Sequence, residues 1–145
     1  MSVIDIQVPG VPIAQGSMVR RGLGIAHSND IELRTWRHAV MSELVAAKPI
    51  GWNDSLPVEV TVTFKFQRPQ SHFGSGRNAD KLLPSAPKEK TTASDTDKLI
   101  RAVGDAIEQS GILRNDSYIV YWNAGKRYVY TGEDPGMDLR IISIE

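Results

Sequence analysis

The clearest structural signal in the chain is the segment Val58-Glu59-Val60-Thr61-Val62-Thr63-Phe64-Lys65-Phe66. Valine or phenylalanine occupies every second position, and polar or charged residues occupy the positions between them. Successive side chains of a strand point to opposite faces of its sheet, so this alternation predicts a β-strand with one buried and one polar face. Valine and phenylalanine also favour the strand conformation.

Upstream of this strand, the sequence predicts a shorter strand and a loop. Residues 3–8 alternate imperfectly and end at Pro9 and Gly10, which indicates a short strand. A loop follows at 11–17, and residues 18–24 are expected to form a flexible or hairpin segment that carries two adjacent arginines, Arg20 and Arg21.

A long helix is predicted next, capped by Asn29 or Asp30 and ended by residues 48–51. Its apolar stripe recurs at three- and four-residue spacing and consists of Leu33, Trp36, Val40, Leu44 and Ala47. We expect Trp36 to be a core residue, because aromatic side chains on such a stripe usually pack inside the protein.

The segment 68–94 has no periodicity and is expected to be a long functional or disordered loop. A second helix is predicted from about Asp95 to Gln109, with Gly111 as its left-handed C-terminal cap. Gly104 inside this helix suggests close packing against the sheet.

The remaining chain predicts two strands, at 118–130 with a bulge at 123–125 and at 139–144, which pair with each other as a hairpin. The resulting fold class is α+β. We expect a single domain over residues 1–145, with a mixed sheet of four or slightly more strands and two main helices packed on one face.

Composition limits the possible functions. The chain has 145 residues, a formal net charge of +0 and no cysteine, which fits one globular domain without disulfides or thiolate metal sites. It contains no apolar run long enough for a membrane span, and residues 1–5 do not resemble a signal peptide, so we expect a cytoplasmic protein. The neutral charge counts mildly against DNA binding, and any DNA-binding surface must come from a local excess of basic residues.

The start of the second helix points to metal chemistry. Asp95 and Asp97 stand two residues apart, Arg101 lies one turn later, and Asp116 follows the end of the helix. Residues two apart on a helix point about 200° apart, so both carboxylates can face one ion only if Asp95 is extended or caps the helix. Three converging carboxylates need a cation, and oxygen ligands favour Mg²⁺ or Mn²⁺. Arg101 could then contact a phosphate.

Ordinary structural roles remain open for the same residues. Ser94 or Asp95 can cap a helix, and residues 115–117 are typical of a turn. Solvated or structural roles are expected for Asp105, Glu108, His27, His38 and His72.

The stretch from 94 to 128 resembles the signature of the RusA-like Holliday junction resolvases, an endodeoxyribonuclease family of bacteria and phages. The family pattern is roughly Asp-x-Asp-Asn-Leu, a Lys two residues later, an Asp-Ala pair, a Gly, and a paired acid followed by Ser. This chain offers Asp95-Thr96-Asp97-Lys98-Leu99, Arg101, Asp105-Ala106, Gly111, Asn115-Asp116-Ser117 and the basic-aromatic strand end Lys126-Arg127-Tyr128. The early Pro-containing loop at 11–16 and Trp36 also resemble the family.

The resemblance implies that Asp95, Asp97 and Asp116 hold the metal and that Arg101 is the essential basic residue. Three departures stand out: Lys98 replaces Asn, Arg101 replaces Lys, and Asn115 replaces the first acid of the pair. None of them removes a metal-binding carboxylate, so we expect catalysis to be retained.

The implied function is a homodimer that cuts four-way junctions symmetrically with Mg²⁺ in DNA recombination and repair. The expected DNA contacts are Lys88, Lys90, Lys98, Lys126, Arg127 and Arg68, with Arg77, Arg20 and Arg21 as further candidates. Two alternatives are a flap or fork nuclease of phage replication and a non-catalytic DNA- or protein-binding dimer. The intact aspartates favour catalysis, because a DNA-binding protein gains nothing from negative charge near DNA. The resemblance also implies a bacterial or phage-encoded protein.

Overall fold

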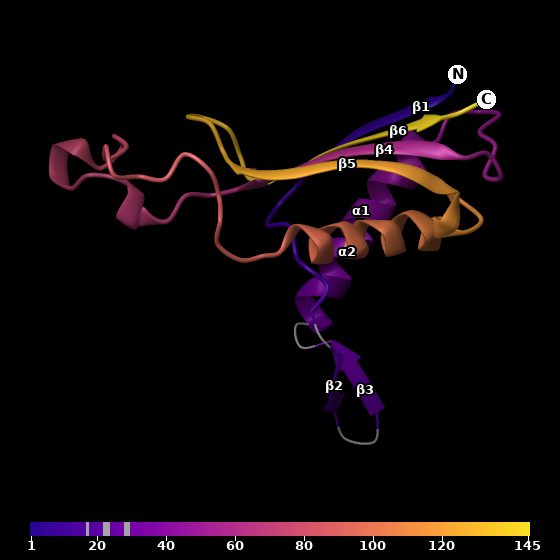
Figure 1. The fold of residues 1–145 in the computed structure, drawn as a ribbon, viewed down its shortest axis with the longest axis horizontal. Coiled ribbons are helices and arrows are strands. Elements are labelled where there is room, and N and C mark those ends of the chain that lie inside the picture. The colour runs from indigo at the N-terminus through magenta and orange to yellow at the C-terminus, as the bar shows by residue number, and fades with distance from the viewer. Residues whose placement is uncertain (17, 22–23, 28–29) are drawn as a thin grey trace.

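A four-stranded sheet and two helices on one of its faces form the two layers of the protein (Figure 1). The computed structural model describes residues 1–16, 18–21, 24–27 and 30–145, and for 18–21 and 24–27 it describes the backbone alone. The sheet contains β1 (Val3–Pro9), β4 (Val58–Phe66), β5 (Ile119–Tyr128) and β6 (Gly136–Ser143), and the helices are α1 (Asp30–Ala47) and α2 (Thr96–Gln109). This architecture confirms the predicted α+β class.

The order of strands across the sheet is β1-β6-β4-β5. β6 is antiparallel to both of its neighbours, and β4 and β5 are parallel. The predicted hairpin between the last two strands is therefore wrong. A parallel pair requires a crossover connection, and α2 lies in the crossover between β4 and β5. The turn after β5 then leads past β4 to β6, which lies between β4 and β1.

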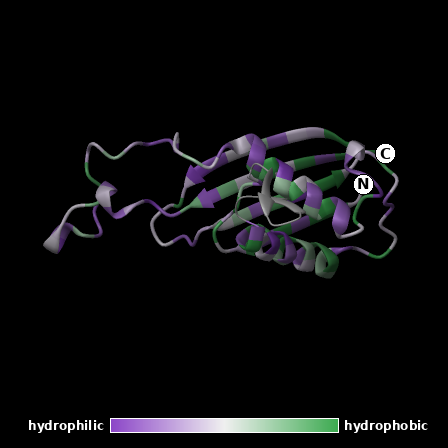
Figure 2. Ribbon diagram, turned by 90° about the horizontal axis from the view of Figure 1, so that it is seen from below, coloured by the Kyte–Doolittle hydropathy of each residue, from purple (hydrophilic) through white to green (hydrophobic). Residues whose placement is uncertain are grey.

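The core lies between the sheet and the helices. Val58, Val60, Val62 and Phe64 of β4 are at most 1% exposed, as their alternation predicted. Figure 2 shows hydrophobic and hydrophilic residues alternating along the strands. Four of the five stripe residues of α1 are buried too, and Ala47 is partly buried. Trp36 is 4% exposed, so it is the core residue that the sequence predicted. Each such side chain stabilises the fold by about 1.5–3 kcal/mol relative to exposure.

A separate two-stranded antiparallel sheet is formed by β2 (Met18–Arg21) and β3 (Gly24–His27). The hairpin alternative for this segment is therefore confirmed for its described backbone. Asn29, one of the two predicted helix caps, lies outside the described residues, as do the side chains of Arg20, Arg21 and His27.

Residues 67–95, called the long loop here, project beyond one end of the sheet (Figure 1). They contain only two 3-10 turns, η1 (Gln70–His72) and η2 (Gly76–Asn78), and one isolated bridge between Phe73 and Leu82. The predicted aperiodic loop is therefore confirmed, and it delivers the chain to the first residue of α2.

Of two local predictions for α2 and β5, the helix cap is confirmed and the bulge is wrong. Gly111 has φ +81°, so it is the left-handed cap that the sequence predicted. The predicted bulge at 123–125 is wrong, because these residues pair regularly with 61–63 of β4. The irregularity lies at the start of the pair, where the register shifts between Val58 and Glu59 and leaves Val120 as the extra residue. Among the described residues, no helix is long and apolar enough to cross a membrane.

A substitution at Gly136 measures how closely β6 packs against β1. A Cβ atom at this position would lie 2.5 Å from the carbonyl oxygen of Val8 and 3.2 Å from the Cα of Pro9. We expect Gly136→Ala to lower the free energy of unfolding by about 1–3 kcal/mol, because the rigid backbone of β1 must move. Gly125→Ala on β5 is the matched control, since nothing lies within 4 Å of its Cβ position. Urea denaturation of both variants measures the difference, and equal midpoints would contradict this account of β6.

Candidate active site

The N-terminal end of α2 presents two exposed carboxylates. Asp95 occupies the N-cap position with extended backbone (φ −71°, ψ 138°), as its proposed role requires. Its side chain makes no capping hydrogen bond and is 65% exposed, so helix capping does not account for Asp95. Asp97 lies in the first turn and is also exposed. Both carboxylates lie at the positive end of the helix dipole, where negative side chains stabilise a helix.

Basic side chains surround this end of the helix. The Lys98 ammonium lies 3.9 Å from a carboxylate oxygen of Asp95, so the residue that departs from the family pattern stands directly beside the acidic pair. Arg101, four residues after Asp97, is exposed. The backbone N–H of Gln15 donates to the carbonyl of Lys98 at 3.1 Å, which places the Pro-containing loop at 11–16 against the same helical turn.

Two lysines hold the segment that leads into Asp95. Lys126, on β5, donates through Nζ to the carbonyls of Thr92 (2.7 Å) and Ser94 (2.8 Å). Lys90 donates to the Thr92 hydroxyl at 2.9 Å and to the Ala93 carbonyl at 2.6 Å. Burial, followed by the charge of Lys126, lowers the pKa of Lys90. The two predicted DNA contacts therefore also shape the backbone at the acidic pair.

The predicted DNA contacts Arg68 and Arg127 have protein partners. Arg68 lies over the Tyr128 ring at 4.4 Å and donates to the Pro87 carbonyl at 2.7 Å. Arg127 donates to both carboxylate oxygens of Glu133, at 2.6 and 2.9 Å. Hydrogen bonds from Arg127 and then from the Tyr130 backbone lower the pKa of Glu133 from 4.5 to about 2, so the charge of Arg127 is compensated near neutral pH.

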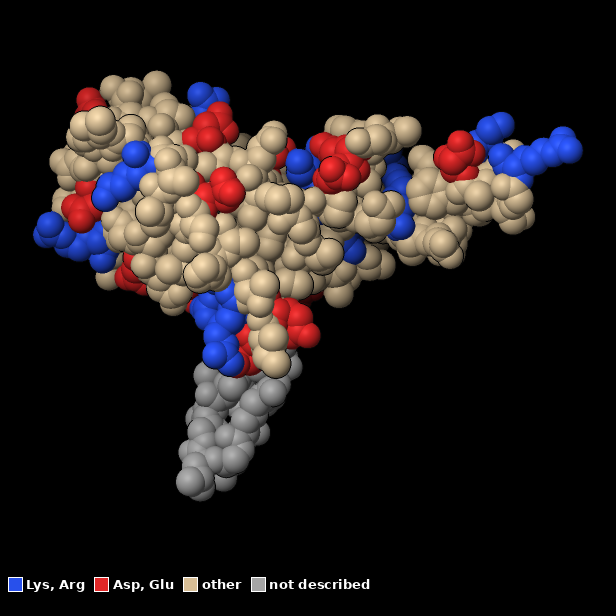
Figure 3. All heavy atoms as spheres, turned by 180° about the vertical axis from the view of Figure 1, so that it is seen from behind, with Lys and Arg blue, Asp and Glu red and all other residues tan. Residues whose placement is uncertain are grey.

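The remaining basic side chains are distributed over the surface. Lys88 is exposed on the long loop, and so are Arg77 and Lys81. His72 packs edge-on against Tyr128, with ring centroids 5.3 Å apart, which confirms its structural role. Figure 3 shows basic and acidic side chains interspersed on the face it draws, with basic side chains at the projecting end of the long loop.

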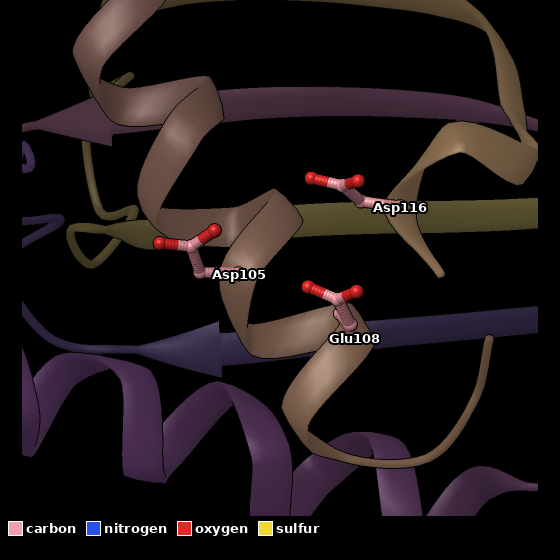
Figure 4. A group of neighbouring side chains, drawn as sticks. All are labelled: Asp105, Glu108 and Asp116. Carbon is pink, nitrogen blue, oxygen red and sulfur yellow. The ribbon is translucent and has the colours of Figure 1, made fainter. Parts of the chain in front are cut away.

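A second acidic group lies at the other end of α2. Carboxylate oxygens of Asp105, Glu108 and Asp116 come within 4.8 Å of one another (Figure 4). Asp116 begins the 3-10 turn η3 (Asp116–Tyr118), and the side chain of Asn115 accepts the hydrogen bond from the Ser117 backbone at 2.8 Å. Asn115 therefore performs the capping of the turn, which leaves the Asp116 carboxylate available. An all-oxygen set of this kind could bind a hard divalent cation.

The environment of Asp105 connects this group to α1. Arg37 lies 3.6 Å from a carboxylate oxygen of Asp105. Asp105 and Glu108 are half-buried, so they are not the fully solvated helix charges that the sequence suggested. Sequence reasoning missed their grouping with Asp116, although their three-residue spacing places them on one side of the helix.

Asp116 does not join Asp95 and Asp97 within one chain. Eleven residues separate Asp97 from Glu108 on α2, which corresponds to about 16 Å along the helix axis. Within one protomer α2 therefore separates Asp116 from Asp95 and Asp97, and the joint role of the three aspartates in metal binding stays a prediction. Asp116 follows shortly after the C-terminal end of α2. The chain comes back to the N-terminal end of α2 at the C-terminal end of β5, where Lys126 contacts the residue before Asp95.

One charged face of α2 connects the two acidic ends. Asp97, Arg101, Asp105 and Glu108 follow one another at intervals of four, four and three residues, which places them on the same side of a helix. This face combines carboxylates for a cation with a guanidinium for a phosphate, a combination that suits phosphodiester chemistry. The fold and this face define a candidate metal-dependent hydrolase of a phosphodiester backbone.

The family comparison gives the class more narrowly. The family model described as "Endodeoxyribonuclease RusA" matches residues 9–142, which is nearly the whole chain of 145 residues. The chain therefore belongs to the RusA endodeoxyribonuclease family, as its signature from 94 to 128 indicated. No curated protein matches it.

The hold of Lys126 on the long loop can be tested directly. We expect Lys126→Met to lower the free energy of unfolding by about 1–3 kcal/mol, because two hydrogen bonds from a charged group to backbone carbonyls are lost. Lys88→Met removes a lysine that is exposed on the same loop and should change stability by less than about 0.5 kcal/mol. Chemical denaturation of both variants provides the comparison. Equal stability would mean that Lys126 does not fix the segment before Asp95.

Proposed function

We propose that the protein is a Mg²⁺-dependent, structure-selective endodeoxyribonuclease that resolves Holliday junctions by paired symmetric cleavage. Membership in the family supports the nuclease class. The observation that carries the finer proposal is the charged face of α2, with carboxylates at both ends and Arg101 between them. Mn²⁺ could replace Mg²⁺, since both favour oxygen ligands.

The residues have distinct proposed roles. Asp95, Asp97 and Asp116 hold the metal, with Asp105 and Glu108 beside Asp116 as further oxygen donors. The ion supplies an activated water and compensation of negative charge on the phosphodiester. Arg101 contacts the phosphate that is cut.

A homodimer offers a way to bring the separated carboxylates together. β5 is an edge strand, so one side of its backbone is unpaired within the protomer, and α2 packs over it, with Gly104 near the Trp122 ring. A two-fold axis beside β5 and perpendicular to α2 would set the α2 helices of two copies antiparallel, because the rotation reverses any direction perpendicular to the axis. Asp95 and Asp97 of one copy would then face the Asp116 end of α2 in the other. Two equivalent sites suit a substrate with two equivalent strands.

The proposed DNA contacts act through the phosphate backbone. Lys98 lies beside Asp95, Lys88 is exposed on the long loop, and Lys90 and Lys126 hold the segment that leads into Asp95. Such contacts make binding salt-dependent and do not select a sequence. A cytoplasmic location, where recombining DNA is present, is part of the same proposal.

Cleavage of defined DNA structures tests the function. We expect the protein to nick four-way junctions symmetrically with Mg²⁺ or Mn²⁺, and to be inactive on linear duplex or in EDTA. Asp97→Asn should abolish cleavage, because a metal ligand is lost, and should leave junction binding equal or stronger, because repulsion from phosphates is reduced. Asp5→Asn, an exposed aspartate on the opposite edge strand β1, serves as the control with unchanged activity.

Each contrary outcome has a definite meaning. Cleavage of flaps or forks in preference to junctions would assign the protein to replication intermediates. Binding without cleavage by the unaltered protein would indicate a non-catalytic DNA-binding dimer. Cleavage that survives Asp97→Asn would show that the metal assignment is wrong.

Mixed dimers test whether the site is shared between copies. Two differently tagged chains, one with Asp97→Asn and one with Asp116→Asn, can be co-expressed and the mixed dimer isolated through both tags. If the site combines Asp97 of one copy with Asp116 of the other, the mixed dimer keeps one intact site and nicks one strand of the junction. If each copy forms its own site, both sites carry a substitution and no nicking occurs.

A further inference from the structure

A hollow of about 1060 Å³ lies where the long loop and the turn after β5 leave the sheet. Residues from 67 to 82 line one side of it, and residues 129–133 line the other. β4 and β5 are parallel, and their C-terminal residues Phe66 and Tyr128 are paired. The long loop and the turn after β5 therefore leave the sheet at the same end of the strands (Figure 1). Arg68, one of the expected DNA contacts, belongs to the lining, and the roles proposed above for the acidic residues do not involve this hollow.

Tyr130 presents an exposed aromatic ring at this hollow. The side chain is among the exposed large hydrophobic ones, at 67%. The Arg127 guanidinium lies over the ring, 3.9 Å from its centroid, and is itself held by Glu133. Glu133 also accepts a hydrogen bond from the backbone N–H of Tyr130 at 2.9 Å. These contacts fix the residue in place, with Arg127 stacked on the ring.

The remaining lining offers both apolar surface and hydrogen-bonding groups, which suit the face and the edge of a planar base. Phe73 and Leu82 add apolar surface, and Gln67, Gln70 and Asp80 add hydrogen-bonding groups that can meet the edge of a base. Glu133 compensates the charge of Arg127. Arg68, which lies over Tyr128 and donates to the Pro87 carbonyl, adds a positive charge to the lining that a phosphate flanking the base could contact. Lys81 is exposed and precedes Leu82 in the sequence, so its ammonium group could contact a phosphate that flanks the base.

The hollow and the acidic pair share one end of the sheet. Lys126 bonds to the Ser94 carbonyl, next to Asp95, and Tyr130 follows Lys126 by four residues. Four residues of extended chain span about 13 Å, which is the length of a few nucleotides. A strand cut at the acidic pair could therefore reach the hollow with a nearby base.

We propose that this hollow receives an unpaired nucleobase of branched DNA, stacked on the ring of Tyr130. The inference rests on the proposed action on branched DNA and adds a contact to a base beside the cut. Stacking of a base on an aromatic side chain contributes about 1–3 kcal/mol, which corresponds to roughly 5- to 150-fold in affinity. Unpaired bases near a branch are the ones that can enter, because they are easily unstacked.

Binding of junctions with single abasic nucleotides tests the contact. The cleavage-deficient Asp97→Asn protein is titrated against junctions in which one base at a time, within several nucleotides of the branch, has been removed. At one position, loss of the base should weaken binding at least fivefold. Adding Tyr130→Ala should weaken binding to the intact junction to the same extent and abolish the dependence on that base, whereas Tyr130→Phe should retain it.

Ile50→Ala is the control, since this exposed apolar side chain lies outside the hollow and outside β5. It should keep the dependence on the base. The inference is overturned if Tyr130→Ala leaves binding unchanged, or if it weakens binding without regard to any base. It is also overturned if light scattering shows that Tyr130→Ala dissociates a dimer, because a second copy then fills the hollow. Failure of the unaltered protein to bind any branched DNA would instead reject the proposed function, and this inference with it.

Discussion

The parallel pairing of β4 with β5 determines where the acidic pair of α2 and the lysines beside it lie. A parallel neighbour can be reached only through a crossover, so the chain must leave β4, traverse the long loop and α2, and re-enter the sheet at the start of β5. As a result, the N-terminus of α2 lies beside the end of β5, where Lys126 reaches the Ser94 carbonyl. The acidic pair, the two lysines and the hollow at Tyr130 all depend on this one pairing.

The same pairing separates the carboxylates that the family pattern groups together. Asp95 and Asp97 precede or begin α2, whereas Asp116 follows it, so the length of the helix lies between them. A chain cannot shorten this distance without losing the crossover. The proposed two-fold dimer would resolve the conflict, because an antiparallel arrangement of the two α2 helices would bring opposite helix ends together without any change of fold.

The parts of this structure that the sequence predicted are those set by local patterns. The alternation at 58–66, the stripe of α1 and the cap at Gly111 concern neighbouring residues, whose geometry is fixed by chain periodicity. The placement of β6 between β1 and β4 was not predicted, because two adjacent strands with a turn between them are equally compatible with a hairpin. The grouping of Asp116 with Asp105 and Glu108 was missed because it depends on where the chain re-enters the sheet. The Arg127 pair with Glu133 was missed for another reason, since a turn brings these two residues together and no repeating sequence pattern marks it.

The departures from the family pattern gain a physical meaning from their neighbours. Asn115 accepts the hydrogen bond of the η3 turn through its side chain, a role that an acid could also fill, so this replacement removes a negative charge without losing the turn. Lys98 places a positive charge 3.9 Å from Asp95, where it compensates part of the acidic pair. Both replacements shift the local charge in the positive direction. In a chain of zero net charge, such local shifts near the carboxylates favour the approach of a phosphate backbone to the proposed cutting site.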